Sequence, residues 1–289
     1  MTEPVITMVD KKAGKGTYHA YYVEGEVRIP PIVVDMNSKP RKHKTLKSWD
    51  DVAQFLEDNP TYQLEHTYLP SISTIAKHAD TGGPGLLTWA AKLAVKYNDE
   101  TAHETVGGEA IAIGSELHNN INEFIATGEQ PTDPSPLFGV WYSSLNERGV
   151  TWWASEKMVY NGDKRYAGTC DAIGYLDGVE TLFDWKTTDE FSYAEQPDGS
   201  IKKTRKYFQN NHTHAAQVAG YISAIQEMGP EFPDMPQPHQ AFIVYVFKDT
   251  KRTQWMKVDL KKATKVFKAC QAIYSLEHTK DKLYEVGVV

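Results

Sequence analysis

Apolar and polar residues alternate along three consecutive segments in the middle of the chain. The segments run over Thr151–Tyr160, Tyr166–Leu176 and Val179–Lys186. A period of two residues is the side-chain spacing of a β-strand, so the pattern predicts three strands in succession. Further along, Ala241–Phe247 and Trp255–Val258 have the same character and predict two more strands.

Other segments repeat their apolar residues with the period of an α-helix. The predicted helices are Ser48–Glu57, with Ser48 or Asp50 as its cap, then Leu86–Tyr97, Glu109–Ala126, Leu137–Glu147, Thr213–Glu227 and Leu260–Glu277. The rest of residues 1–66 has the pattern of short strands and turns. Helices, three strands, a helix and more strands together indicate a mixed α/β fold with a hairpin at its centre.

Asp177-Gly178 is the strongest short hairpin signal in the sequence. A two-residue turn of this type needs positive φ angles, which Asp and Gly tolerate. Such a turn pairs Leu176 with Val179, and counting back along both strands puts Asp171 opposite Asp184. Facing side chains of an antiparallel pair lie roughly 5 Å apart.

Two facing carboxylates repel each other unless a cation neutralises them, and a hard divalent cation such as Mg²⁺ prefers their oxygens. Lys186 lies two residues after Asp184, so we expect it on the same face. The opposite face is apolar and predicts a core, because it carries Cys170, Ala172, Leu176, Val179, Phe183 and Trp185. A surface hairpin with scattered charges is the alternative, and it would bind no metal at the two aspartates.

In the helix Glu109–Ala126, His118 falls on one stripe with Ile111, Gly114, Ile121 and Ile125. A histidine on such a stripe is more often a buried core residue than a ligand. Gly114, one turn earlier, would let the helix approach a sheet closely, and His118 would then reach the carboxylates as a third metal ligand. The sequence leaves both interpretations open.

Three other polar sets have weaker signals. Gln217 and Tyr221 are spaced i, i+4 on one helix face, which by itself indicates a polar pair at a helix edge. Glu156 shares a strand face with apolar residues, so it needs a partner, either near a metal or in a structural ion pair. His212 and His214 are interpreted as loop residues, since no third ligand accompanies them.

The net charge of -7 argues against broad, charge-driven coating of nucleic acid, although a local basic channel is compatible with it. Two cysteines, Cys170 and Cys270, cannot form a disulfide framework or an iron–sulfur site. The N-terminus lacks the pattern of a signal peptide, and no apolar run is long enough to cross a bilayer. We therefore expect a cytoplasmic protein without membrane contact.

The order of these motifs resembles the RecB-type nuclease domains of the PD-(D/E)xK superfamily, over about residues 68–260. The matching segments are His118 in "GSELHNNI", Gly168 to Asp171 in "GTCD", Asp184 to Lys186 in "DWKTT", and Gln217 to Tyr221 in "QVAGY". "LPSISTI" and "LLTWAAK" also look like parts of small phage-type and mitochondrial genome-maintenance exonucleases. Residues 67–289 would form the nuclease domain, and residues 1–66 an N-terminal extension or subdomain.

The resemblance implies a restriction-endonuclease-like core, a mixed central sheet flanked by helices. His118, Asp171 and Asp184 would bind Mg²⁺ or Mn²⁺, with the Trp185 backbone carbonyl as a further ligand. Lys186 would orient or activate the attacking water. Gln217 and Tyr221 would line the site beside DNA, and Glu156 fits a less constant acidic position. The four-cysteine cluster of some relatives has no counterpart here.

The expected activity is metal-dependent hydrolysis of DNA phosphodiester bonds from an end, in recombination or repair. The nearest relatives also suggest single strands as the preferred substrate, which is the weaker of the two inferences. One alternative is a non-catalytic DNA-binding or recombination-accessory module. Another is a structure-specific endonuclease with the same site. The intact Asp171, Asp184 and Lys186 favour an enzyme over a pure binder.

Overall fold

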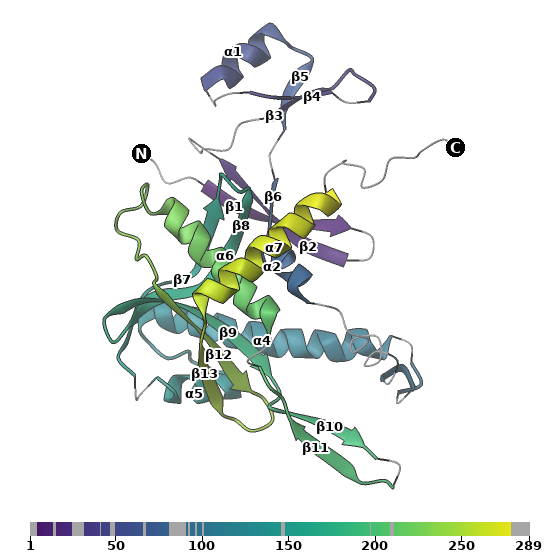
Figure 1. Cartoon of the computed structure of the whole chain (residues 1–289), viewed down its shortest axis with the longest axis vertical. Helices are drawn as coiled ribbons and strands as arrows, with labels where there is room; N and C mark the ends of the chain where they lie inside the picture. Colours follow the sequence, from purple (N-terminus) through teal and green to yellow (C-terminus); the bar gives the residue numbers. More distant parts are fainter. Residues whose placement is uncertain are drawn as a thin grey trace.

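A computed structural model of the chain describes most of its residues. The described ranges are 5–13, 16–24, 32–40, 42–46, 50–65, 68–80, 91, 93–95, 97–99, 101–145, 148–196, 198–208 and 211–278. The chain folds into a mixed α/β structure around a central five-stranded sheet (Figure 1).

The central sheet has the strand order β13-β12-β9-β8-β7. Strands β9 and β12 are parallel, and the other neighbours are antiparallel. The bounds are β7 (Val150–Asn161), β8 (Tyr166–Leu176), β9 (Val179–Thr188), β12 (Gln240–Phe247) and β13 (Thr253–Lys257). All five predicted strands are therefore confirmed, with ends that differ by at most a few residues.

Helices cover both faces of this sheet. One face is covered by α4 (Ala102–Thr127) and α5 (Pro136–Ser143). The other is covered by α2 (Ile72–Ala76), α6 (His212–Met228) and α7 (Leu260–His278), with the short 3-10 helix η1 (Lys77–Ala79) after α2. A parallel pair such as β9 and β12 needs a crossover connection, which here contains α6.

Each face of the sheet has its own core. On the α4–α5 side, Ala172, Phe183 and Trp185 pack in one cluster, as the alternation predicts. The face that carries Asp171 and Asp184 is also part of a core, which the sequence did not predict, because α6 buries it in a second cluster containing Ile173. Cys170 also packs there, and Val179 beside the turn is 46% exposed, so neither joins the core predicted for it.

Helix ends differ from the predictions in two places. Helix α4 begins at Ala102 rather than at Glu109, and its first half extends beyond the sheet (Figure 1). Ile111 in this half is 71% exposed, so the predicted apolar stripe is buried only further along, at Ile121. Helix α5 ends at Ser143, before the predicted Glu147. Of the predicted helix Leu86–Tyr97, residues 91, 93–95 and 97 are helical, and the rest lies outside the described residues.

The N-terminal residues form two small sheets. The first contains β1 (Val5–Ala13), β2 (Gly16–Glu24) and β6 (Tyr68–Pro70), and the second contains β3 (Ile32–Asp35), β4 (Lys42–Thr45) and β5 (Tyr62–Glu65), beside α1 (Asp50–Asp58). Helix α1 confirms the predicted helix, although Ser48 lies outside the described residues. Because β2 pairs with β6, one sheet crosses the predicted boundary after residue 66, and the division there stays a prediction.

A two-stranded hairpin follows the central strand β9 and was not predicted. Its strands are β10 (Phe191–Glu195) and β11 (Ile201–Arg205), which pair only with each other in the described structure. In Figure 1 it projects away from the body of the molecule. As for membranes, none of the described helices combines the length and the apolar character that crossing a bilayer requires.

Candidate metal centre

The Asp177-Gly178 turn has the predicted geometry. Asp177 and Gly178 have φ angles of 52° and 78°. The antiparallel ladder runs from Leu176↔Val179 back to Ala172↔Phe183 in the predicted register. A turn longer by one residue would have moved the aspartates to the other face of the sheet, so the local turn chemistry fixes the site.

The backbone pairing of β8 with β9 ends at Ala172↔Phe183. Beyond this pair, the Asp171 side chain accepts a hydrogen bond from the backbone of β9. The Oδ2 atom of Asp171 accepts a hydrogen bond from the backbone N–H of Trp185 at 2.7 Å. The N–H and C=O of one strand residue point to the same side, so the Trp185 carbonyl also faces Asp171. This orientation agrees with the carbonyl ligand that the resemblance implies.

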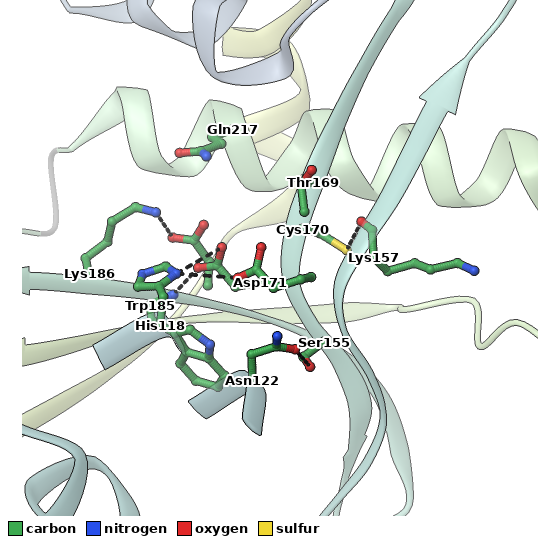
Figure 2. Close-up of polar contacts among 12 residues, drawn as sticks. His118, Asn122, Ser155, Lys157, Thr169, Cys170, Asp171, Trp185, Lys186 and Gln217 are labelled. Atoms are coloured by element: carbon green, nitrogen blue, oxygen red, sulfur yellow. Dashed lines mark hydrogen bonds and ion pairs between the residues drawn. The ribbon is translucent and has the colours of Figure 1, made fainter. Parts of the chain in front are cut away.

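Three side chains from three elements converge beside this break in the ladder. Nδ1 of His118 on α4 lies 3.7 Å from Oε1 of Glu156 on β7 and 3.8 Å from Oδ1 of Asp171 on β8. One ligand atom from each residue lies within 4.8 Å of the others. Figure 2 shows His118 and Asp171 pointing toward each other. His118 is therefore placed as a possible ligand, not as a core residue.

Glu156 has a backbone conformation that is unusual for a strand. Its φ angle is 47°, in the left-handed region that costs a non-glycine residue about 1–2 kcal/mol. The flanking pairs Ser155↔Ala172 and Lys157↔Cys170 place it across from Asp171. Strain of this kind is often found at functional sites. It turns a glutamate that the alternation had placed among apolar residues toward His118.

Asp184 and Lys186 form a buried ion pair next to this group. The Lys186 Nζ atom is 2.7 Å from Oδ2 of Asp184, and Asp184 is only 1% exposed. Among the described residues, Oδ1 of Asp184 has no hydrogen-bond partner. A buried carboxylate oxygen without a partner is costly, and a cation in the adjacent space would satisfy it.

The predicted ligand set and the observed cluster differ in one member. Sequence reasoning placed Asp184 with His118 and Asp171, and placed Glu156 outside them. In the described structure Glu156 completes the three-residue group, and Asp184 is paired with Lys186 instead. His118, Glu156 and Asp171, with Asp184 alongside, offer imidazole and carboxylate groups that could hold a divalent cation.

Close contact between α4 and the sheet positions His118. A Cβ atom at Gly114 would come within 3.0 Å of Oγ1 of Thr187 on β9, so the helix crosses the strand where it has no side chain. One turn after His118, Asn122 accepts a hydrogen bond from the Ser155 hydroxyl on β7 (Figure 2). These contacts confirm the close approach predicted from Gly114.

Helix α6 brings Gln217 and Tyr221 to the site. The Gln217 side chain donates a hydrogen bond to the Tyr221 hydroxyl at 2.9 Å, and Tyr221 is 4% exposed. A Cβ atom at Gly168 would lie 2.8 Å from Cε1 of Tyr221, so the glycine three residues before Asp171 makes room for that ring. Taken alone, the pair had been interpreted as lying at a helix edge. The structure instead buries Tyr221 beside the carboxylates.

Burial and neighbouring charges set the protonation of these groups. Burial raises the pKa of Asp184, and Asp171 adds to the rise although Lys186 opposes it. Burial lowers the pKa of Lys186, but the attraction of Asp184 and Asp171 outweighs it, so the net pKa is raised. Burial likewise lowers the pKa of His118, and Asp171 and Glu156 reverse that effect and raise it. Burial raises the pKa of Tyr221 well above its usual value, so the phenol keeps its proton.

Sequence reasoning missed two contributions to the site. His212 and His214 both lie in the first turn of α6, not in a loop, and the Nδ1 atom of His214 is 2.9 Å from the Tyr245 hydroxyl. Burial and Lys186 lower the pKa of His214 to about 4, which keeps its ring neutral. On the other side, the Tyr21 hydroxyl of β2 is 3.2 Å from Oγ1 of Thr169. Long-range packing creates both contacts, and no local pattern signals them.

His118 and Glu156 line an open cleft of about 890 Å³, whereas Asp171, which lies 3.8 Å from His118, is not part of the lining. The walls of the cleft include His118 from α4, Lys186 from β9 and Tyr221 from α6. Met8 and Tyr21, from the N-terminal hairpin, also line it. Residues of the N-terminal extension therefore contribute to the cleft that contains the candidate ligands.

Comparisons with known proteins give little further information. No family model and no curated protein matches the sequence. Among solved structures, the chain is similar to the crystal structure of SSO0001, with a TM-score of 0.30 and 13% identity over 77% of this chain and 84% of that one. A likeness at this TM-score carries no argument about fold family or function.

Proposed function

We propose that the protein is a metal-dependent deoxyribonuclease with a PD-(D/E)xK core, and that it hydrolyses DNA from its ends. The observation that carries this proposal is the convergence of His118, Glu156 and Asp171 beside the buried Asp184–Lys186 pair. A protein that only binds DNA gains nothing from carboxylates facing phosphate, because they repel it. A hydrolase needs them to hold a cation.

His118, Glu156 and Asp171 would hold the cation, and Asp184 would contribute its unpartnered Oδ1 atom. When bound, Mg²⁺ or Mn²⁺ supplies Lewis-acid chemistry, because it lowers the pKa of water and offsets negative charge on phosphate. The Trp185 backbone N–H donates a hydrogen bond to Oδ2 of Asp171 and so holds that carboxylate in one orientation. The ligand set is thus largely arranged before any ion binds.

Lys186 acts in this proposal as a fixed positive charge. Its raised pKa keeps the ammonium protonated, so it donates hydrogen bonds to the phosphate or to the attacking water rather than removing a proton. Charge placed in advance where negative charge develops is usually the largest single contribution to catalysis. The short contact with Asp184 holds the ammonium in the cleft.

Tyr221 and Gln217 would position the substrate beside the ligands. The high pKa of Tyr221 keeps a hydroxyl donor in a wall of the cleft, and Gln217 holds that hydroxyl from the preceding helical turn. A cleft of about 890 Å³ lies at the large end of the range for ligand sites. It has room for more than one nucleotide, as cleavage of a polymer requires.

The proposal is tested by incubating end-labelled linear DNA, single- and double-stranded, with Mg²⁺ or Mn²⁺. The wild-type protein should degrade at least one substrate, and EDTA should prevent this. Lys186→Ala should lower the rate by about 100- to 1000-fold, as loss of one preorganised donor does. Lys257→Ala, which removes an exposed lysine from edge strand β13, is the matched control and should leave the rate unchanged.

Circular single-stranded DNA in the same assay separates the alternatives. An exonuclease spares the circle, whereas a structure-specific endonuclease with the same site cuts it. If folded wild-type protein cleaves none of these substrates with either metal, the catalytic proposal is wrong. A non-catalytic DNA-binding module then becomes the better account.

A further inference from the structure

The β10–β11 hairpin projects from the molecule but is firmly anchored at its base. The Glu190 carboxylate is buried, and it is 2.9 Å from Arg205 of β11 and 2.6 Å from Arg252, in the turn that joins β12 to β13. Asp249 of the same turn accepts hydrogen bonds from the backbone N–H groups of Glu190 and Phe191. A two-stranded hairpin alone is marginally stable in water, so these contacts hold it in place.

One face of this hairpin interleaves aromatic and basic side chains. The register pairs Phe191 with Arg205 and Tyr193 with Lys203, and directly paired residues share a face. The Lys203 Nζ atom lies 3.9 Å from the centre of the Phe191 ring and 5.9 Å from that of Tyr193. Tyr193 is 57% exposed, and the neighbouring Ile201 is 68% exposed.

The hairpin is also locally basic in an acidic protein. Lys202, Lys203, Arg205 and Lys206 fall within five consecutive residues, whereas the whole chain has a net charge of -7. The hairpin sequence contains two acidic residues, Glu195 and Asp198, which lie near its turn, and Arg205 at its base is paired with Glu190, so Lys202, Lys203 and Lys206 supply the basic character. Lysines neutralise phosphates, and exposed aromatic rings stack on bases whose faces are free. A duplex offers its phosphates but keeps its bases stacked inside.

We propose that this face of the β10–β11 hairpin binds the single-stranded part of the DNA substrate, by base stacking on Tyr193 and phosphate contact with Lys203. That the bound strand is a substrate rests on the proposed function. The chain runs from Lys186 in β9 to Tyr193, seven residues later, a separation of at most about 23 Å for an extended chain. At roughly 3.4 Å per stacked nucleotide, the hairpin would contact a strand up to about seven nucleotides from the site.

The test measures binding of a fluorescent (dT)20 strand and of a 20-base-pair duplex by anisotropy in EDTA. Tyr193→Ala should weaken binding of the single strand by about fivefold or more, because stacking of one base contributes roughly that much. Lys203→Ala should weaken it too and make it less sensitive to salt. Lys265→Ala removes an equal charge from an exposed position on α7 and should change neither affinity.

Two results would overturn the assignment. In one, both hairpin variants bind (dT)20 within twofold of the wild-type affinity. In the other, single strand and duplex lose affinity equally, which would mean that the hairpin contacts only phosphates. Tyr193 and Lys203 are exposed, so neither substitution removes core packing, and thermal unfolding verifies that the variants are folded.

A small chromogenic substrate separates this inference from the proposed function. Thymidine 5′-(4-nitrophenyl phosphate) is too short to reach the hairpin from the cleft. If the wild type and the hairpin variants hydrolyse it equally with Mn²⁺ while the variants lose (dT)20 affinity, both proposals hold. If no protein hydrolyses it but (dT)20 affinity still falls, the hairpin site stands and the nuclease proposal fails. If the proteins hydrolyse the small substrate but the hairpin variants keep the wild-type affinity for (dT)20, the nuclease proposal stands and the hairpin assignment fails.

Discussion

Four ionisable side chains at the site differ in chemistry because their surroundings differ. Asp171 has one oxygen on a backbone N–H and the other toward His118, so its side chain is held in one orientation. Asp184 is buried against Lys186, and each stabilises the charge of the other. Removing one member of such a pair leaves the other charge buried without a partner, which is strongly destabilising. The activity of the Lys186→Ala variant is therefore interpreted only where thermal unfolding shows that the variant is folded at the assay temperature.

The raised pKa of His118 predicts how metal binding depends on pH. Without metal, a raised folded-state pKa stabilises the protein below the unfolded value of about 6.5, and this contribution is lost as pH rises through the folded-state pKa. A metal must displace the proton, so it binds more tightly at high pH. Mn²⁺ should therefore raise the melting temperature more at pH 8 than at pH 6.

Differential scanning fluorimetry with Mn²⁺ or EDTA measures this effect. At a concentration one hundred times its Kd, the ion should stabilise by about 2.7 kcal/mol. His118→Asn should reduce the shift at pH 8 and remove most of its dependence on pH. An equal shift at both pH values in the wild type would contradict the assignment of His118 as a ligand.

For single residues, the sequence predicts the positions that are set by the register of one local turn. The facing of Asp171 and Asp184 follows from the register of the Asp177-Gly178 hairpin, which the ladder confirms up to Ala172↔Phe183. The position of Glu156 does not follow from alternation, because its positive φ turns the side chain away from the expected face. His214 was misplaced because its contact with Tyr245 joins residues distant in the sequence.

Secondary-structure elements approach one another at glycines, and this packing shapes the site. Gly168 on β8 lies under Tyr221 and Ile72, which come from α6 and α2. The glycine of the "GTCD" motif thus has a steric function, since it lets a helix side chain lie against the strand that carries Asp171. The contact between Gly168 on β8 and Tyr221 on α6 therefore accounts for one residue of each of the two motifs.

Gly168→Ala should destabilise the protein by about 1–3 kcal/mol, because the new methyl group would lie 2.8 Å from the Tyr221 ring. Urea unfolding measures the change, and the loss should be smaller when Tyr221 is replaced by Leu. Gly139→Ala is the control, because nothing lies within 4 Å of a Cβ atom at that position on α5. It should be neutral or stabilising, given the helix propensity of alanine. Equal effects of the two substitutions would refute the steric role.

Elements with a clear apolar period were predictable, and the β10–β11 hairpin was not. The five strands of the central sheet are rich in apolar residues because at least one face of each packs on a core, and β12 is apolar almost throughout because both of its faces are buried. The hairpin buries little, so its strands are less apolar, although Asp198-Gly199 is a turn signal of the same kind as Asp177-Gly178. Gly199 has a φ of 78°, as such a turn requires. Phe191 and Tyr193 alternate with Ser192 and Ala194 before this turn, and this alternation was the local signal for strand β10.

On the scale of the whole molecule, acidic charge and a local basic element coexist. A net charge of -7 opposes unspecific attachment to DNA, so affinity has to come from particular contacts. In the proposed function, the cleft and the projecting hairpin would supply these contacts. The N-terminal residues Met8 and Tyr21 add to the cleft, so the extension contributes to the site as well. This joint contribution was not predictable, because β2 and β8 are far apart in the sequence.

The most direct test of a metal-dependent nuclease centred on Asp171 is the single-turnover rate on a 5′-labelled linear single strand across a Mn²⁺ titration. The wild-type rate should rise and saturate with Mn²⁺. Asp171→Asn should reduce it by more than about 100-fold, beyond the effect expected for an outer-shell residue. Asp163→Asn, an equal change in the exposed β7–β8 turn, should match the wild type. Metal-independent cleavage, or equal rates for the two variants, would contradict the account.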